Sequence, residues 1–300
     1  MSTASTLSAS SALAGNSRRR RAKDVTMRVV VWGAFLIALI PLVSLLWVVV
    51  SKGLSRFDGE FFNSSMQVPL GAPGGAIHAI VGTLIVTGWA ALISVPIGLM
   101  TAVYLVEYGH GRLAKSITFF VDVMTGIPSI VAGLFAFSVF VIFFGADAKM
   151  GITGAVALSV LMIPVVVRST EEMLRLVPNE LREASYALGV PKWLTIVKVV
   201  LRTSVAGIMT GVMLALARVI GETAPLLVTA GLASNMNYNA FSERMTTLPV
   251  FVYNQYQNPG IDADPYYARA WAGALTLVLI VMVLNLAARI IAKIFSPKSR

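Results

Sequence analysis

Six long apolar segments separated by polar stretches dominate the chain. A helix needs about 20 mainly apolar residues to cross the hydrocarbon core of a bilayer. The segments have about this length or more, except for the fourth, which is the shortest. They cover residues 29–50, 79–106, 117–146, 151–167, 204–230 and 270–290. The pattern predicts an all-α polytopic membrane protein with six transmembrane helices, in one domain over residues 29–294.

The polar ends of the chain are predicted to be tails. Residues 1–17 are rich in Ser, Ala and Thr without apolar periodicity, and basic residues follow them. Residues 1–28 are therefore expected to form a disordered basic cytoplasmic tail, and residues 295–300 a second cytoplasmic tail. The first apolar segment is too long for a signal peptide and lacks a convincing cleavage site, so we expect a retained helix.

Composition agrees with a lipid-facing protein. The chain is 57% hydrophobic and 13% charged, whereas soluble domains carry about 25% charged residues. The net charge of +10 could indicate nucleic acid, but the basic residues cluster beside apolar segments, which favours anionic membrane lipids instead. Cysteine is absent, and His78 and His110 are too far apart for metal-ligand spacing. No metal site is expected.

The distribution of Lys and Arg predicts the orientation. If both termini are cytoplasmic, 18 of these residues lie inside, 5 lie outside and Arg218 lies within a span. Positive charge gathers on the cytoplasmic side of membrane proteins. The ratio therefore predicts cytoplasmic termini, an even number of spans and an extracytoplasmic loop at 231–269.

Residues 168–203 form a polar cytoplasmic insert between the fourth and fifth apolar segments. Ser169 to Arg175 is expected to continue the fourth helix out of the membrane. A second helix should start at Pro178 and stop at Gly189, and a third should start at Pro191. Thirty residues are more than a connection needs. The insert fits either an interfacial amphipathic helix or a docking element for a cytoplasmic partner.

Two charges interrupt the fifth apolar segment. Arg218 and Glu222 have i,i+4 spacing, which on a helix would place them on one face, where they can pair. One interpretation is a structural ion pair. The other is a transient anion site, because a guanidinium matches two phosphate oxygens; the Thr223 hydroxyl would then add a donor. Pro128 and Pro225 are expected to interrupt or kink their spans, and the pair Gly207 and Gly211 predicts close helix packing.

A resemblance favours the docking interpretation. The string Glu183-Ala184-Ser185-Tyr186-Ala187-Leu188-Gly189 resembles the E-A-A-x-x-x-G element of ABC importer permeases. The usual I-x-L-P ending is replaced here by Val199-Val200-Leu201-Arg202. The resemblance implies a MetI-like permease fold, with a coupling helix that docks on an ATPase subunit. It assigns the coupling role to Glu183, Ala184, Ser185 and Gly189.

Longer stretches resemble phosphate-importer permeases of the PstA type. They include Gly126-Ile127-Pro128-Ser129-Ile130 and the string from Arg218 to Leu226. The resemblance implies a non-catalytic subunit of the bacterial inner membrane that transports inorganic phosphate, with Arg168, Arg218 and Glu222 sensitive for transport. It implies as partners a second homologous permease, two ATP-binding cassette subunits that bind ATP and Mg, and a periplasmic or lipid-anchored phosphate-binding protein. No cofactor of the chain itself is expected.

Three alternatives remain open at this point. The chain could be a permease for another oxyanion or small solute, or an ion-coupled secondary transporter, although such transporters usually show internal repeats. A membrane scaffold would give no reason for Arg218 in mid-span. Residues 109–116 nearly spell a P-loop, but Ala114 replaces its second glycine. ATP hydrolysis is therefore assigned to a partner.

Overall fold

The computed structural model describes residues 5–66 and 74–295, with side chains placed over 20–66, 74–145 and 147–293. It divides into two units, Met1–Ser51 and Lys52–Arg300. The described part of the first unit lies within helix α1 (Ser5–Gly53), which has 49 residues. Residues 5–28, predicted as a disordered tail, are helical in the structure. Ala and Arg, which are common in this stretch, have high helix propensity, so the helix can continue beyond the apolar segment.

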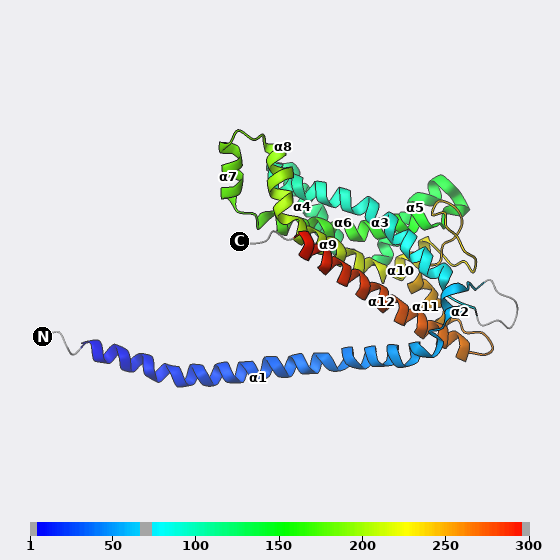
Figure 1. The fold of residues 1–300 in the computed structure, drawn as a ribbon, viewed down its shortest axis with the longest axis horizontal. Coiled ribbons are helices and arrows are strands. Elements are labelled where there is room, and N and C mark those ends of the chain that lie inside the picture. The colour runs from blue at the N-terminus through cyan, green and yellow to red at the C-terminus, as the bar shows by residue number, and fades with distance from the viewer. Residues whose placement is uncertain (1–4, 67–73, 296–300) are drawn as a thin grey trace. The chain divides into compact units, whose positions relative to one another are not determined.

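Every regular element that the structure describes in the second unit is a helix (Figure 1). The all-α prediction is therefore confirmed. The elements are η1 (Leu54–Arg56), α2 (Gly59–Asn63), α3 (Ile77–Val103), η2 (Tyr104–Tyr108), α4 (Gly111–Gly126), α5 (Ser129–Phe144), η3 (Gly145–Ala148), α6 (Gly151–Arg175), α7 (Asn179–Ala187), α8 (Lys192–Thr195), η4 (Ile196–Val200), α9 (Leu201–Ile220), α10 (Ala224–Thr229), α11 (Leu248–Gln257) and α12 (Asp264–Phe295). The predicted tail at 295–300 lies outside the described residues except for residue 295.

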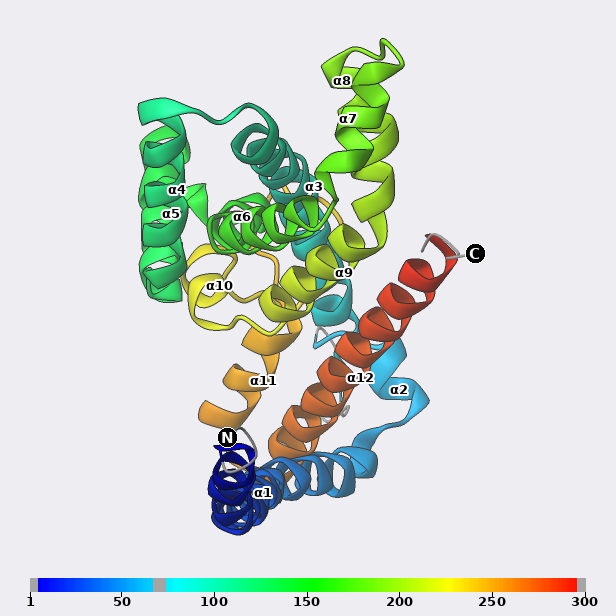
Figure 2. The same cartoon turned by 90° about the vertical axis from the view of Figure 1, so that its left-hand side faces the viewer.

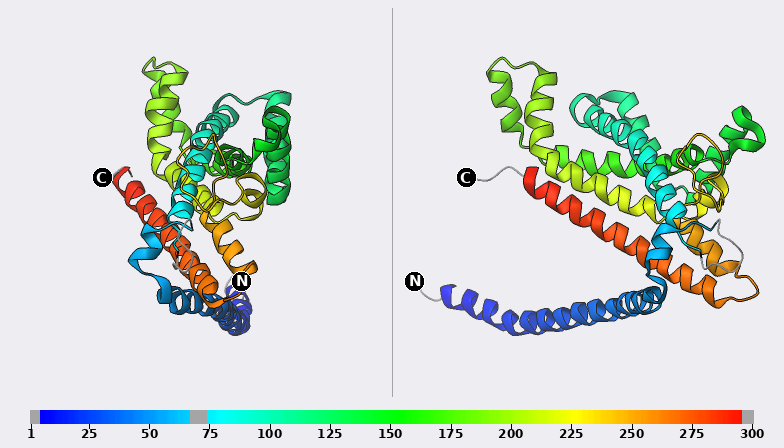
Figure 3. Two further views of the ribbon diagram at one scale, coloured as in Figure 1. Left: turned by 90° about the vertical axis from the view of Figure 1, so that its right-hand side faces the viewer. Right: turned by 45° about the vertical axis from the view of Figure 1, so that its right-hand side comes forward.

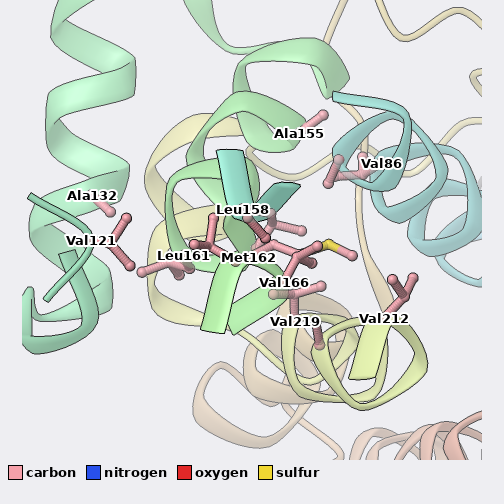
Figure 4. Close-up of a cluster of buried hydrophobic side chains, with 14 of the residues drawn as sticks. Val86, Val121, Ala132, Ala155, Leu158, Leu161, Met162, Val166, Val212 and Val219 are labelled. Atoms are coloured by element: carbon pink, nitrogen blue, oxygen red, sulfur yellow. The ribbon is translucent and has the colours of Figure 1, made fainter. Parts of the chain in front are cut away.

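Helix α6 lies at the centre of this unit and packs against α3, α5, α9 and α10. Figure 4 shows Leu158, Met162 and Val166 of α6 between Val86 of α3 and Val219 of α9. The helix continues to Arg175, eight residues beyond the predicted end of the fourth span. Its last turns are polar, as the sequence predicted for residues 169–175.

The third predicted span, 117–146, consists of two helices. Helices α4 and α5 meet at an angle of 109°. Pro128 causes the break, because proline has no N–H to donate and disfavours helical backbone at the residue before it. Ile127 accordingly has extended backbone, with φ −69° and ψ 127°.

The two pieces together make one crossing. The starts of α3 and α6 lie against the same loop: Gly82 of α3 is next to Thr246, and Gly151 of α6 is next to Met245. The two helices therefore run in the same direction, and the chain between them must cross back through α4 and α5. With the five helices that are long and apolar enough to span a bilayer, this makes six candidate crossings, the number that the sequence predicted.

The fifth predicted span, 204–230, is also broken. Helix α9 ends at Ile220, and α10 begins only at Ala224. Gly221 is a poor helix former and Pro225 cannot donate a hydrogen bond to the preceding turn, so the helix stops between them. The sequence predicted no more than a kink here.

The glycine pair of α9 packs against α6. A Cβ at Gly207 would lie 2.2 Å from Met173 Sδ, and one at Gly211 would lie 2.4 Å from Ser169 Oγ. The predicted close packing is confirmed, and the order of these contacts makes α6 and α9 antiparallel. On another side α9 packs along α12 (Figure 3). The sixth span thus joins the bundle through α9.

Gly82 offers a test of the packing between α3 and the 231–247 segment. A Cβ at Gly82 would lie 2.1 Å from the carbonyl oxygen of Thr246, whereas a Cβ at Gly88 of the same helix would meet nothing within 4 Å. We expect Gly82→Ala to destabilise the purified chain by about 1–3 kcal/mol. Gly88→Ala should leave stability unchanged or slightly higher. Equal thermal unfolding midpoints in detergent for the two variants would contradict this packing.

Candidate functional site

The insert projects from one end of the helix bundle as two helices, α7 and α8 (Figures 1 and 2). Pro178 precedes α7, and Gly189 ends the turn after it with a φ of +76°. Such a backbone is strained for any residue with a Cβ. The hydroxyls of Ser185 and Thr195 are 2.8 Å apart and buried, so they hold α7 against α8. Both helices begin one residue after the predicted starts at Pro178 and Pro191, and α7 ends two residues before Gly189.

The residues assigned to coupling divide into two groups. Glu183 and Ala184 are exposed, as is Gly189, whereas Ser185 is buried against α8. Several large apolar side chains of the insert are also exposed, with Leu188 at 83%. They are Leu181, Tyr186, Leu188 and Trp193. An exposed apolar surface around exposed polar residues is typical of a protein interaction site.

A buried ion pair that the sequence did not reveal attaches the insert to α3. Arg182 of α7 donates from Nη2 and Nε to Glu107 Oε1, at 2.9 and 3.2 Å. Glu107 lies in η2, directly after α3, and only 5% of its side chain is exposed. The one signal in the sequence is a carboxylate at the end of an apolar segment. Its partner is 75 residues away, so spacing could not identify it.

A second charge cluster joins α4 to α6. Arg168 Nη1 donates to Glu171 Oε2 at 2.8 Å, and Arg175 Nη2 donates to Glu171 Oε1 at 2.6 Å. Arg168 also forms an ion pair with Asp122 of α4. A cavity of about 400 Å³ lies beside the cluster, with Lys115, Asp122, Glu171 and Arg175 in its lining. Arg168 is thus held between two carboxylates.

Arg168 and Arg218 lie at different levels of the bundle. Ser169 contacts Gly211, and Arg218 is seven residues further along α9. With a rise of 1.5 Å per residue, this separates the two arginines by about 10 Å along the helix axis. The structure therefore does not bring the two predicted transport residues into one cluster.

The predicted pairing of Arg218 with Glu222 is not formed. Because α9 ends at Ile220, Glu222 lies outside the helix, and i,i+4 geometry does not apply. Among the described side chains, no carboxylate lies within ion-pair distance of Arg218, which is exposed. Glu222 is half-buried, and its N–H donates to the Val219 carbonyl at 3.2 Å. Thr223 immediately precedes α10, which begins at Ala224.

The break after α9 packs against α5, the second half of the other broken span. A Cβ at Gly133 of α5 would lie 2.6 Å from the Cα of Pro225. Irregular backbone at membrane depth is tolerated where it is packed in protein or lines a cavity. The break thus leaves the exposed guanidinium of Arg218 near the end of α9. Among the described residues, no group of three His, Asp or Glu could hold a metal ion.

Comparison with known proteins assigns the chain to a family. Residues 94–300 match the sequence profile of the binding-protein-dependent transport system inner membrane component. The chain belongs to this family. Members are inner membrane components of their transport systems, which agrees with the six crossings. The match begins inside α3 and includes the insert and the break after α9.

Relatives within this permease family extend the similarity over most of the chain. The phosphate transport system permease protein PstA 1 of Mycobacterium tuberculosis is 47% identical over 94% of this chain and 91% of its own length. The phosphate transport system permease protein PstA of Yersinia pestis is 39% identical, over 91% of this chain and 90% of its own. The resemblance to PstA-type permeases is confirmed.

Solved structures confirm the fold. A chain of a bacterial alginate ABC transporter in complex with a periplasmic protein matches with a TM-score of 0.64 at 14% identity, over 94% of this chain and 99% of that chain. A chain of the inward-facing MetNI methionine ABC transporter matches with a TM-score of 0.57 at 19% identity, over 74% and 95%. At these identities the likeness concerns the fold alone. The predicted MetI-like fold of ABC importer permeases is correct.

Proposed function

We propose that this chain is the permease subunit of an ATP-driven importer of inorganic phosphate. The observation that carries the proposal is its 47% identity, over nearly the whole chain, to a protein named as a phosphate transport permease. The exposed guanidinium at the helix break supports it, because a guanidinium binds two phosphate oxygens at once and keeps its charge.

The chain would form half of the translocation pathway, and a second homologous permease the other half. Arg218 lies where α9 ends, with no carboxylate paired to it among the described residues. It is therefore available to a passing anion. Thr223 can add a hydroxyl donor. Glu222, which is four residues from Arg218 and adjacent to Thr223, limits how tightly an anion is held. Transport requires binding that is weak enough to be released.

Arg168 has a different role in this proposal. It is neutralised by Asp122 and Glu171 and bridges α4 and α6. Such a bridge stabilises one arrangement of the two helices, and its loss should change the balance between the conformations of alternating access. Arg168 would then affect transport through helix position rather than through contact with phosphate.

The insert would be the docking element for the ATPase. Its exposed residues Glu183 and Ala184, with the apolar side chains around them, form a surface on α7 and α8 that a groove in a partner can cover. The partners would be two ATP-binding cassette subunits, which hold ATP and Mg, and a periplasmic or lipid-anchored phosphate-binding protein. The chain itself would hold no cofactor and catalyse no reaction.

The insert then faces the cytoplasm, and both termini lie on the same side. An even number of crossings requires that the two termini share a side. A cytoplasmic location of that side is supported by the Lys and Arg residues, of which 18 would then lie inside and 5 outside. The loop with α11 faces the binding protein. In this orientation the chain would act as an alternating-access permease in the bacterial inner membrane.

Competition between oxyanions tests the substrate. Cells that express the complete transporter should take up labelled phosphate, and an excess of unlabelled phosphate should suppress that uptake. Sulfate and molybdate in the same excess should have no effect. Uptake of sulfate or molybdate, without uptake of phosphate, would show a permease for another oxyanion and contradict the proposal.

A further inference from the structure

The insert contacts the bundle at a third place, in addition to its two covalent connections to α6 and α9. Its two helices continue along the chain into α6 on one side and into η4 and α9 on the other. Arg182 adds a contact with α3 through Glu107. Lys192, at the start of α8, donates to the backbone carbonyl of Glu107, and its Nζ lies 4.6 Å from the centre of the Tyr108 ring. Both helices of the insert therefore contact the end of α3.

The contact between Arg182 and Glu107 is buried and hydrogen-bonded. Besides Glu107, the guanidinium donates to the carbonyl oxygens of Leu174 at 3.0 Å and Val177 at 2.6 Å. Only 13% of the Arg182 side chain and 5% of the Glu107 side chain are exposed. Removing one partner of such a buried pair leaves the other as an uncompensated charge, whereas the intact pair fixes one geometry. Arg182 thus holds α7, the end of α6 and the end of α3 together.

We call the contact between Glu107 and Arg182 the joint. Helix α3 runs from the joint to the opposite end of the bundle. It packs along α6 over its length, and near its start Thr83 Oγ1 accepts a hydrogen bond from the Leu248 N–H at 2.7 Å. Gly82 lies under the Thr246 carbonyl. One helix therefore contacts both the insert and the segment that leads into α11.

The backbone beside the joint is π-helical on both sides. The segments η2, which contains Glu107, and η4, which follows α8, are each one π-helical stretch of five residues. π-Helical turns are rare, and they occur frequently at functional sites. One of them follows α3 and contacts the insert through Glu107, and the other follows α8 within the insert.

We propose that Glu107 is the positioning residue through which a movement of α7 and α8 reaches α3. The inference rests on the proposed docking of an ATPase on the insert. When the ATPase moves α7, Arg182 carries Glu107 and the end of α3 with it. Helix α3 then shifts against α6 and under the 246–248 backbone. The joint therefore determines how much transport results from each ATP hydrolysed.

The test compares phosphate import per ATP hydrolysed in the complete transporter, reconstituted in proteoliposomes with the phosphate-loaded binding protein. Glu107→Gln keeps the size of the side chain and removes its charge. We expect it to lower import per ATP about tenfold, which lies within the usual range of coupling between sites. The ATPase subunits should still co-purify, because α7 keeps its exposed surface. Glu172→Gln, the same change at an exposed carboxylate of α6, should leave the ratio unchanged.

Glu107→Asp is the second variant. It keeps the charge but draws the carboxylate back by one methylene, so we expect an intermediate loss, about fivefold. A wild-type ratio in both Glu107 variants would overturn the proposal. Loss of the ATPase subunits from Glu107→Gln would also overturn it, because Glu107 would then build the docking surface instead of transmitting movement. If the unaltered chain fails to retain an ATPase, the proposed function itself fails, and this inference with it.

Discussion

Replacing Arg218 by alanine is expected to reduce phosphate uptake by at least about thirtyfold. Around a bound phosphate in the pathway the guanidinium would be one partner of a buried hydrogen-bonded charge pair. Truncating such a partner costs about 2–5 kcal/mol, and each 1.4 kcal/mol is a factor of ten. Arg218 is the charge at the break after α9, and no described carboxylate is paired with it. Its loss should therefore act on the passing anion rather than on the fold. The measurement is the initial rate of labelled phosphate uptake at low external phosphate.

Two further variants make this prediction specific. Arg202→Ala removes the same side chain from an exposed position at the start of the same helix, and uptake should stay near the wild-type rate. Arg218→Lys keeps the charge but loses the planar fork, so we expect partial uptake. If Arg218→Ala is present in the membrane in the wild-type amount and phosphate uptake is normal, Arg218 does not contact phosphate during transport.

Replacing Gly189 by valine is expected to lower phosphate uptake about tenfold while the chain still inserts into the membrane. Gly189 has a φ of +76°, and a non-glycine residue in such a conformation costs about 1–3 kcal/mol. The turn between α7 and α8 would open to relieve this strain, and the exposed surface of α7 would be displaced from its partner. ATP hydrolysis should then no longer respond to the phosphate-loaded binding protein.

Gly111 provides a matched control for this effect. It has the same φ of +76°, and a Cβ at either glycine would meet nothing within 4 Å. Gly111→Val therefore introduces a similar backbone strain at the start of α4, outside the insert. It should reduce uptake less than Gly189→Val. Equal losses in the two variants would mean that general destabilisation, and not the docking surface, explains the result.

Local features of the sequence were enough to predict the spans and the insert. The length of each apolar segment determines whether it can cross a bilayer. Pro178, Gly189 and Pro191 determine where the helices of the insert begin and end, since each acts on its own backbone. These predictions needed no knowledge of which helices pack together.

Contacts between distant residues could not be predicted in this way. Glu107 and Arg182 are separated by 75 positions, and Asp122 and Arg168 by 46. Each pair forms only because helices from different parts of the chain pack together. The pairing of Arg218 with Glu222 failed for a local reason. It assumed an unbroken helix, whereas Gly221 and Pro225 end α9 before Glu222.

ATP dependence tests the central claim most directly. Proteoliposomes that contain the complete transporter should accumulate labelled phosphate only when both hydrolysable ATP and the phosphate-binding protein are present. A non-hydrolysable ATP analogue should abolish accumulation. Accumulation that persists without the ATPase subunits, driven by an ion gradient instead, would contradict the account and identify a secondary transporter.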